Sequence, residues 1–167
     1  VRTILDASYK YIVPGYQRNF EWKREQAEEF WGDISSGSVF LGNLVLDTSE
    51  EKSNNILIVD GQQRITTIFI FLAACRYQST KINSVSQTGA ILRKISFIDD
   101  TSGKASSSKL IPSPSIKDVF EQTIVNPEWD GKRFEGRGIQ RQINKLKPIY
   151  DFFVENISSY GTEDLAE

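Results

Sequence analysis

Residues 60–64 bring an acid, a glycine, two amides and an arginine together between two apolar segments. The apolar flanks predict a buried strand followed by a buried helix, so these polar groups meet at a helix start. One interpretation is structural, because Asp60 and Gln63 have the spacing of a capping box. Capping does not explain Arg64, since a cation in the first helical turn is disfavoured by about 0.3–1 kcal/mol unless an anion is near. That anion is either a carboxylate such as Asp60 or a bound phosphate, which Gly61 would allow to approach closely.

A second segment of similar chemistry lies near the start of the chain. The stretch VPGYQRNFEW, residues 13–22, combines an amide, an arginine and aromatic residues on a predicted loop before a helix. Arg18 has the donors to clamp an anion, and Tyr16 can stack on a base or donate through its hydroxyl. The alternative is that Phe20 and Trp22 anchor the loop to the core while Arg18 pairs with a neighbouring glutamate. Two Gln-Arg pairs at or before helix starts favour a ligand site.

Hydrophobic periodicity predicts the elements that must position these two segments. Strands are expected at residues 9–13, 39–47 and 56–60, with the last two joined as a hairpin by the polar turn 49–55. Helices are expected at residues 23–35, 62–77, 113–125 and 138–160. Residues 89–99 and 108–113 fit either two short strands or the end of a helix. This order predicts an α+β fold, with a core over residues 1–80 and a mainly helical part over 81–167 that extends or completes the same domain.

The composition excludes several kinds of catalytic site. The chain of 167 residues contains no histidine and one cysteine. Ser-His and Cys-His triads, His-dependent nuclease centres and structural zinc sites are therefore ruled out for this chain. Cys75 lies in an apolar helical pattern, where a thiol acts as a small hydrophobic side chain. Catalysis would have to use carboxylates, amides, arginine, lysine, tyrosine or a bound metal.

Composition and hydropathy predict an ordinary globular protein and no membrane association. Hydrophobic residues make up 39% and charged residues 25% of the chain. No apolar run reaches the roughly 18 residues that a membrane-spanning helix needs. The first twenty residues lack the apolar stretch of a secretory signal, so a cytoplasmic location is the expectation.

Three motifs in order resemble a known family. The segments IVPGYQRNFEWKREQAEEFWGDI, FLGNLVLD and ILIVDGQQRITTI are similar to the N-terminal domain of GmrSD-type, modification-dependent restriction endonucleases and related phage-defence proteins. The resemblance runs from about residue 9 to residue 77. It implies a fold related to ParB and sulfiredoxin, with a small mixed sheet and packed helices. It also implies the binding and hydrolysis of a nucleoside triphosphate, for which the DGQQR motif is the signature.

Carried over to this sequence, the resemblance implies a nucleotide pocket made by both motifs. Its predicted catalytic residues are Asp60, Gln62, Gln63 and Arg64, and its predicted nucleotide-binding residues are Tyr16, Gln17, Arg18, Gly42, Gly61 and Arg64. Gly42 would allow close approach of the ligand or the opposing loop, with a bulge glycine as the alternative. Asp60 would bind Mg²⁺ or orient water. In the family a separate C-terminal domain carries a histidine-based nuclease, so cleavage by this histidine-free chain alone is not expected.

Two alternatives lack catalysis. The first is a DNA-binding or modification-sensing module. Six basic residues and one acid lie between positions 132 and 147, namely Lys132, Arg133, Arg137, Arg141, Lys145, Lys147 and Glu135. The net charge of −2 is unfavourable for nonspecific phosphate binding, and a solvated helix face or a surface that docks another domain explains the cluster equally well. The second alternative is a regulatory domain that acts on a nuclease through contact, without binding a nucleotide.

Overall fold

Four short strands form a mixed sheet in the order β2-β3-β1-β6. In the computed structural model, which describes residues 5, 8–37, 42–49, 53–126, 128, 134 and 136–159, these strands are β1 (Lys10–Ile12), β2 (Val45–Asp47), β3 (Asn55–Asp60) and β6 (Leu110–Ile111). Strands β3 and β6 both pair in parallel with β1, whereas β2 pairs antiparallel with β3. The carboxyl ends of β1, β3 and β6 therefore lie at one edge of the sheet, where ligands bind in open sheets with parallel strands.

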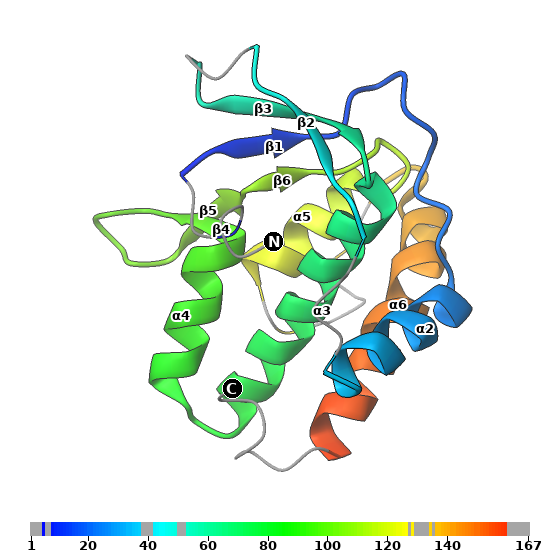
Figure 1. Cartoon of the computed structure of the whole chain (residues 1–167). Helices are drawn as coiled ribbons and strands as arrows, with labels where there is room; N and C mark the ends of the chain where they lie inside the picture. The colour runs from blue at the N-terminus through cyan, green and yellow to red at the C-terminus, as the bar shows by residue number, and fades with distance from the viewer. Residues whose placement is uncertain are drawn as a thin grey trace.

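The helices lie on one side of this sheet (Figure 1). They are α2 (Arg24–Ser35), α3 (Gln62–Lys81), α4 (Val85–Ile95), α5 (Lys117–Val125) and α6 (Ile139–Ser159). Helix α3 packs against α4, α5 and α6 and occupies the centre of this layer. A separate antiparallel pair, β4 (Ser96–Ile98) and β5 (Ala105–Ser108), leads from α4 back to β6. Because α3 starts at the end of β3, the sheet and the central helix together fix the position of the 60–64 turn.

The core explains why α3 is apolar on nearly every face. Its residues are buried on all sides between the sheet and the other helices. Phe71 of α3 makes edge contacts with Phe30 of α2 and Phe153 of α6, with ring centroids 6.0 and 5.4 Å apart. Such contacts add about 0.5–1.5 kcal/mol per pair beyond the burial of area. Cys75 is also buried in α3, and this burial raises the pKa of its thiol to about 12, so the thiol stays protonated and unreactive at neutral pH.

The structure confirms the predicted α+β fold with its helical C-terminal part and corrects several element boundaries. The hairpin of β2 and β3 forms as predicted, but β2 is restricted to Val45–Asp47, and residues 38–41 of the predicted strand lie outside the described residues. Residues 89–99 divide into the end of α4 and strand β4. Pro148 lies within α6 and does not end it.

Strand β6 comes from the second half of the sequence and is the neighbour of β1. Tyr11 N–H donates to the Lys109 carbonyl and Val13 N–H donates to the Ile111 carbonyl, at 2.8 and 2.9 Å. Residues from both halves therefore build one sheet. The segment that follows β6 is thereby placed beside the loop that follows β1.

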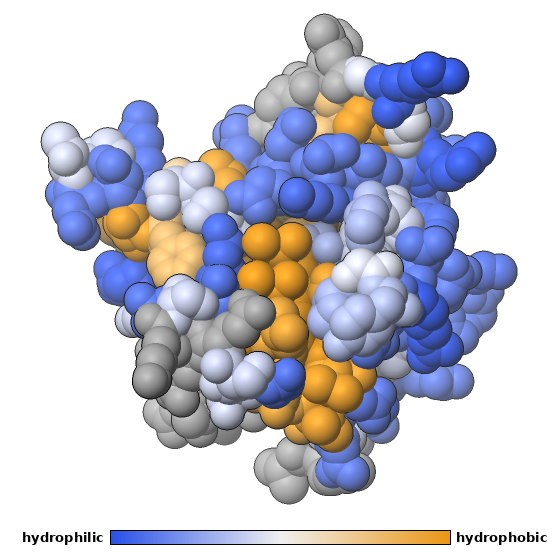
Figure 2. Space-filling model, turned by 90° about the horizontal axis from the view of Figure 1, so that it is seen from above, coloured by the Kyte–Doolittle hydropathy of each residue, from blue (hydrophilic) through white to orange (hydrophobic). Residues whose placement is uncertain are grey.

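The outer face of the sheet carries apolar side chains. In β3, Ile56 and Ile58 point inward and are buried, whereas the alternate residues Leu57 and Val59 point outward. Val59 is 40% exposed. Seen from above, the molecule has hydrophobic residues gathered near the middle of the visible surface (Figure 2). None of the described helices has the length and apolar character needed to cross a membrane.

Candidate nucleotide site

Three segments meet at the carboxyl edge of the parallel strands. They are the loop 14–23 after β1, the turn 60–64 between β3 and α3, and residues 42–44 before β2. The first two contain the Gln-Arg pairs predicted to form one site. The contacts between them define how the site is built.

Gln63 holds the backbone of the loop. Its side chain is buried, and its amide Nε2 donates to the Asn19 carbonyl at 2.9 Å. Its Oε1 accepts from the N–H groups of Glu21 and Trp22, at 2.9 and 3.2 Å. One glutamine therefore supplies hydrogen-bond partners for three backbone groups of the loop, which lie outside any helix or strand. The side chain has this positioning role whether or not it contacts a ligand.

Gln62 makes a second connection to the same loop. Its Nε2 donates to the Arg18 carbonyl at 2.8 Å and lies 3.4 Å from Oε1 of Gln17. Gln17 in turn donates to the Val59 carbonyl at 2.7 Å, so the loop is attached to the end of β3 as well. Among the described residues the Oε1 atom of Gln62 has no hydrogen-bond donor, which leaves this oxygen available to a water molecule or ligand.

The capping-box interpretation of this turn is wrong. The N-cap residue of α3 is Gly61, with φ of 85°, and no side chain caps the helix. The Asp60 carboxylate accepts instead from Gly61 N–H at 2.8 Å, and the Gln63 amide is used by the loop. The N–H groups of Gln62, Gln63 and Arg64 have no acceptor among the described residues. The first turn of α3 therefore presents three free donors at the positive end of a helix.

Arg64 extends from this first turn over the ring of Trp22. Its guanidinium carbon lies 6.0 Å from the ring centroid. Within the described part of the chain Arg64 makes neither a hydrogen bond nor an ion pair, so Asp60, one of the alternatives for its partner, does not pair with it. Gly42 makes room for it: a Cβ atom at Gly42 would lie 2.4 Å from the guanidinium carbon. Among the described residues this partly buried cation therefore has no anionic partner, and the lack of a side chain at Gly42 leaves the space that the guanidinium occupies.

Two cavities adjoin the arginines. The first, of about 280 Å³, is lined by Trp22, Gln26, Glu29, Phe30, Asp33, Gly42 and Arg64. The second, of about 410 Å³, is lined by Arg18, Glu21, Trp22, Lys23, Glu25 and Gln26. Because Trp22 and Gln26 line both, the two cavities lie side by side along the start of α2. Each cavity contains one arginine, and the pair offers two cations beside an aromatic ring.

A comparison with family models identifies the domain. The model for the N-terminal domain of the GmrSD restriction endonuclease matches residues 1–167, the whole chain. The chain belongs to this family. Restriction endonucleases cleave DNA, so a nuclease part and DNA are the partners that membership in the GmrSD family implies. A comparison with curated proteins gives no match.

The structure of this GmrSD N-terminal domain separates the predicted site residues into two groups and adds residues that were not predicted. Asp60, Gly61, Gln62, Gln63, Arg64, Gln17, Arg18 and Gly42 belong to the segments that meet at this edge. Tyr16 is 78% exposed and lines neither of the two arginine cavities. Trp22, Glu29 and Asp33 line the Arg64 cavity but are absent from the predicted site. The spacing of Glu29 and Asp33, four residues apart in α2, was a usable signal, because such positions share a helix face.

The basic segment does not form one continuous stripe of cations. Arg137 and Arg141 are exposed. Lys147 forms an ion pair with Asp151, and Lys145 points to the backbone of the loop 14–23. Lys132 and Arg133 lie outside the described residues. Of the four described basic residues, two are therefore engaged within the chain, which weakens the structural basis for a DNA-binding face here.

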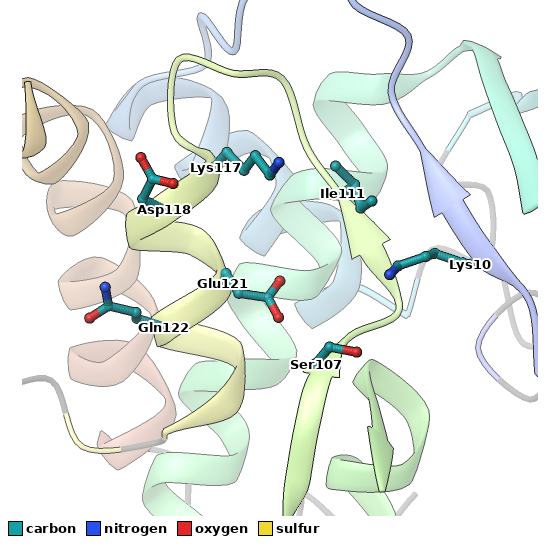
Figure 3. Close-up of a pocket in the computed structure, with 7 residues that line it drawn as sticks. All are labelled: Lys10, Ser107, Ile111, Lys117, Asp118, Glu121 and Gln122. Carbon is teal, nitrogen blue, oxygen red and sulfur yellow. The ribbon is translucent and has the colours of Figure 1, made fainter.

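A further cavity of about 380 Å³ lies between β6 and α5, away from both motifs. The ammonium groups of Lys10 and Lys117 point into it, together with the carboxylate of Glu121, whereas Asp118 and Gln122 point away (Figure 3). Glu121 already accepts from Ser108 N–H at 2.8 Å. None of the predicted site residues lines this cavity.

Proposed function

We propose that this GmrSD N-terminal domain binds and hydrolyses a nucleoside triphosphate, and that hydrolysis regulates DNA cleavage by the nuclease part of the same restriction system. The proposal is supported by membership of the family, whose name establishes the restriction context. It is also supported by the concentration of free donors at the carboxyl edge of the sheet, where phosphate groups bind in related architectures.

The observation that carries the proposal is the unpaired guanidinium of Arg64. A cation in the first turn of a helix is disfavoured by the helix dipole by about 0.3–1 kcal/mol. Within the described residues no carboxylate forms an ion pair with it. No ion pair within the described residues accounts for this arginine, whereas a bound phosphate would give an acceptor to the guanidinium and to the free N–H groups of the same helical turn.

The site residues have distinct roles in this proposal. Arg18 and Arg64, which line the two adjacent cavities beside Trp22, neutralise the charge of the phosphate groups. The free N–H groups of Gln62, Gln63 and Arg64 hold one phosphate; the Gly61 N–H does not, since it donates to Asp60. Gln62 orients the attacking water through its free Oε1 atom. Gln63 has a supporting role, because both ends of its amide hold the loop.

The residues of the site fit a magnesium ion only together with a nucleotide. Among the described residues no group of three or more acidic, histidine or cysteine side chains could hold a metal. Mg²⁺ in proteins is commonly held by one or two carboxylates, several waters and the phosphates of the substrate. Asp60, which is exposed, would supply one such carboxylate, and Glu29 and Asp33 are the carboxylates of the Arg64 cavity. Bound in this way, Mg²⁺ would neutralise charge on the phosphates.

This set of groups is sufficient for phosphoryl transfer. The reaction depends mainly on positioning and on stabilisation of charge at the transferring phosphate. Two arginines, backbone donors and one amide oxygen supply these functions without histidine. The absence of histidine from the chain is therefore compatible with triphosphate hydrolysis.

Titration of the purified chain with ATP, GTP, CTP and UTP in the presence of Mg²⁺ tests the proposal. We expect at least one triphosphate to bind with a Kd between about 1 μM and 1 mM and to release phosphate at a measurable rate. The corresponding nucleoside, which lacks the phosphates, is the control and should bind far more weakly. A folded chain that binds none of the four triphosphates would contradict the proposal and leave the 60–64 turn with a structural role.

Gly42→Ala should weaken triphosphate binding by displacing Arg64. The added Cβ would lie 2.4 Å from the guanidinium, so the arginine must move, and the left-handed φ of 89° adds about 1–2 kcal/mol of backbone strain. Gly37→Ala is the matched control, because Gly37 has a similar φ of 75° with no atom within 4 Å of an added Cβ. Both variants should lose similar stability in thermal melts. Only Gly42→Ala should raise the Kd, by about tenfold, and an equal Kd for the two variants would refute this role of Gly42.

A further inference from the structure

Phe20 is the residue at which the loop 14–23 is attached to the second half of the chain. Its ring is 2% exposed and lies in the core. Its N–H donates to the hydroxyl oxygens of Ser113 and Ser115, at 3.0 and 3.3 Å. These serines follow β6, which pairs with β1 and brings them next to the loop. Phe20 lies two residues after Arg18 and two before Trp22, so its position constrains both.

Lys145 of α6 completes the attachment. Its Nζ donates to the Phe20 carbonyl at 3.1 Å and lies 3.6 Å from the carboxylate of Glu21. The lysine side chain is 32% exposed, so water screens this contact only in part. Gln63 holds the same loop from α3, through Asn19, Glu21 and Trp22. The loop backbone is therefore held from two helices at successive residues.

The contact between Lys145 and the loop lies beside a cavity and not in a closely packed core. A cavity of about 310 Å³ lies between the loop and α6 and is lined by Phe20, Glu21, Trp22, Lys23, Arg24, Glu25, Asn144, Lys145 and Pro148. Pro148 has no N–H, so the carbonyl of Asn144, one helical turn before it, receives no hydrogen bond from residue 148. Among the described residues, Lys145 makes the hydrogen bond and the ion pair that join α6 to the loop across this open region.

We propose that Lys145 is a positioning residue for the nucleotide site, which it serves by fixing the Arg18–Trp22 segment from helix α6. This inference rests on the proposed function of the site. It gives the lysine a role within the domain in place of the DNA contact that its basic neighbours suggested. It also connects α6 to Phe20 and Glu21, which lie between Arg18 and Trp22 in the loop.

The test compares three variants in a chain that keeps Trp22 as its only tryptophan through Trp31→Phe and Trp129→Phe. Lys145→Met removes the charge and the donor but keeps the length of the side chain, and Lys145→Arg restores both. Arg141→Met is the matched control, because Arg141 is exposed one turn earlier on α6 and has no hydrogen-bond or ion-pair partner among the described residues. Two quantities are measured: acrylamide quenching of Trp22 without nucleotide, and the Kd of the triphosphate that the wild-type chain binds.

We expect Lys145→Met to increase the quenching of Trp22 and to raise the Kd about tenfold, the change for loss of one charge-assisted hydrogen bond. Lys145→Arg should restore both values, and Arg141→Met should change neither. Unchanged quenching in Lys145→Met would overturn the proposal, and so would increased quenching with an unchanged Kd. If the wild-type chain binds no triphosphate, the proposed function fails, while the quenching comparison still shows whether Lys145 positions the loop.

Discussion

Arg64→Ala is expected to lower the affinity for the bound triphosphate by about 100-fold while the domain stays folded. The phosphate would lose a charge-assisted pair of hydrogen bonds, which contributes roughly 1.5–3 kcal/mol per bond to a charged group. Calorimetric titration of the variant measures this loss. Arg137→Ala is the control, because Arg137 is exposed in the basic segment 132–147, outside the segments that form the candidate site. This variant should leave the affinity unchanged.

The expected stability of Arg64→Ala separates a binding role from a folding role. The variant loses a cation–π contact with Trp22 that contributes about 0.5–1 kcal/mol. It also removes a cation from the positive end of α3, which recovers about 0.3–1 kcal/mol. These contributions nearly cancel, so the midpoint of thermal unfolding should change by no more than a few degrees. A large drop in that midpoint with normal nucleotide affinity would show that Arg64 is a structural residue.

Gln63→Ala is expected to have the largest effect on stability among the site variants. The substitution leaves the Asn19 carbonyl and the N–H groups of Glu21 and Trp22 without their partner. Each unsatisfied group costs about 1–3 kcal/mol when buried, and less where water reaches the loop. We expect a total loss of about 2–4 kcal/mol, measured by urea unfolding.

Gln26→Ala provides the comparison for Gln63→Ala. Gln26 is the same residue type near the same loop, but among the described residues its Oε1 accepts a single hydrogen bond, from Lys23 N–H at 2.9 Å on the exposed surface. Its loss should cost about 0.5–1.5 kcal/mol. If the two variants lose the same stability, the three contacts of Gln63 do not hold the loop. Gln63→Ala should also weaken nucleotide binding, because the loop carries Arg18 and Trp22.

The family motifs made the residues of the candidate site recognisable in the sequence. Arg64 and the two glutamines stood out because a cation and two amides are unexpected between a buried strand and a buried helix. The helix over residues 62–81 was predictable in type, since its apolar residues continue over several turns. The N-cap was not predicted correctly, because the spacing of Asp60 and Gln63 fits a capping box equally well. The partners of the Gln63 amide belong to a loop that is distant in the sequence, such as Glu21, 42 residues away, and local spacing does not predict them.

The sequence by itself determined the kind of elements and the kind of chemistry. Local periodicity predicts that nearly every face of α3 and the alternate residues of β3 are buried. The residue types at 16–18 and 60–64 are the basis of the proposal that the site binds an anion through arginines and amides. The tertiary structure alone decided which groups meet. The pairing of β6 with β1, the passage of Arg64 beside Gly42 and the contact of Lys145 with Phe20 join residues far apart in the chain. Such contacts depend on the packing of the whole core, which leaves no periodic signal in the sequence around any one of them.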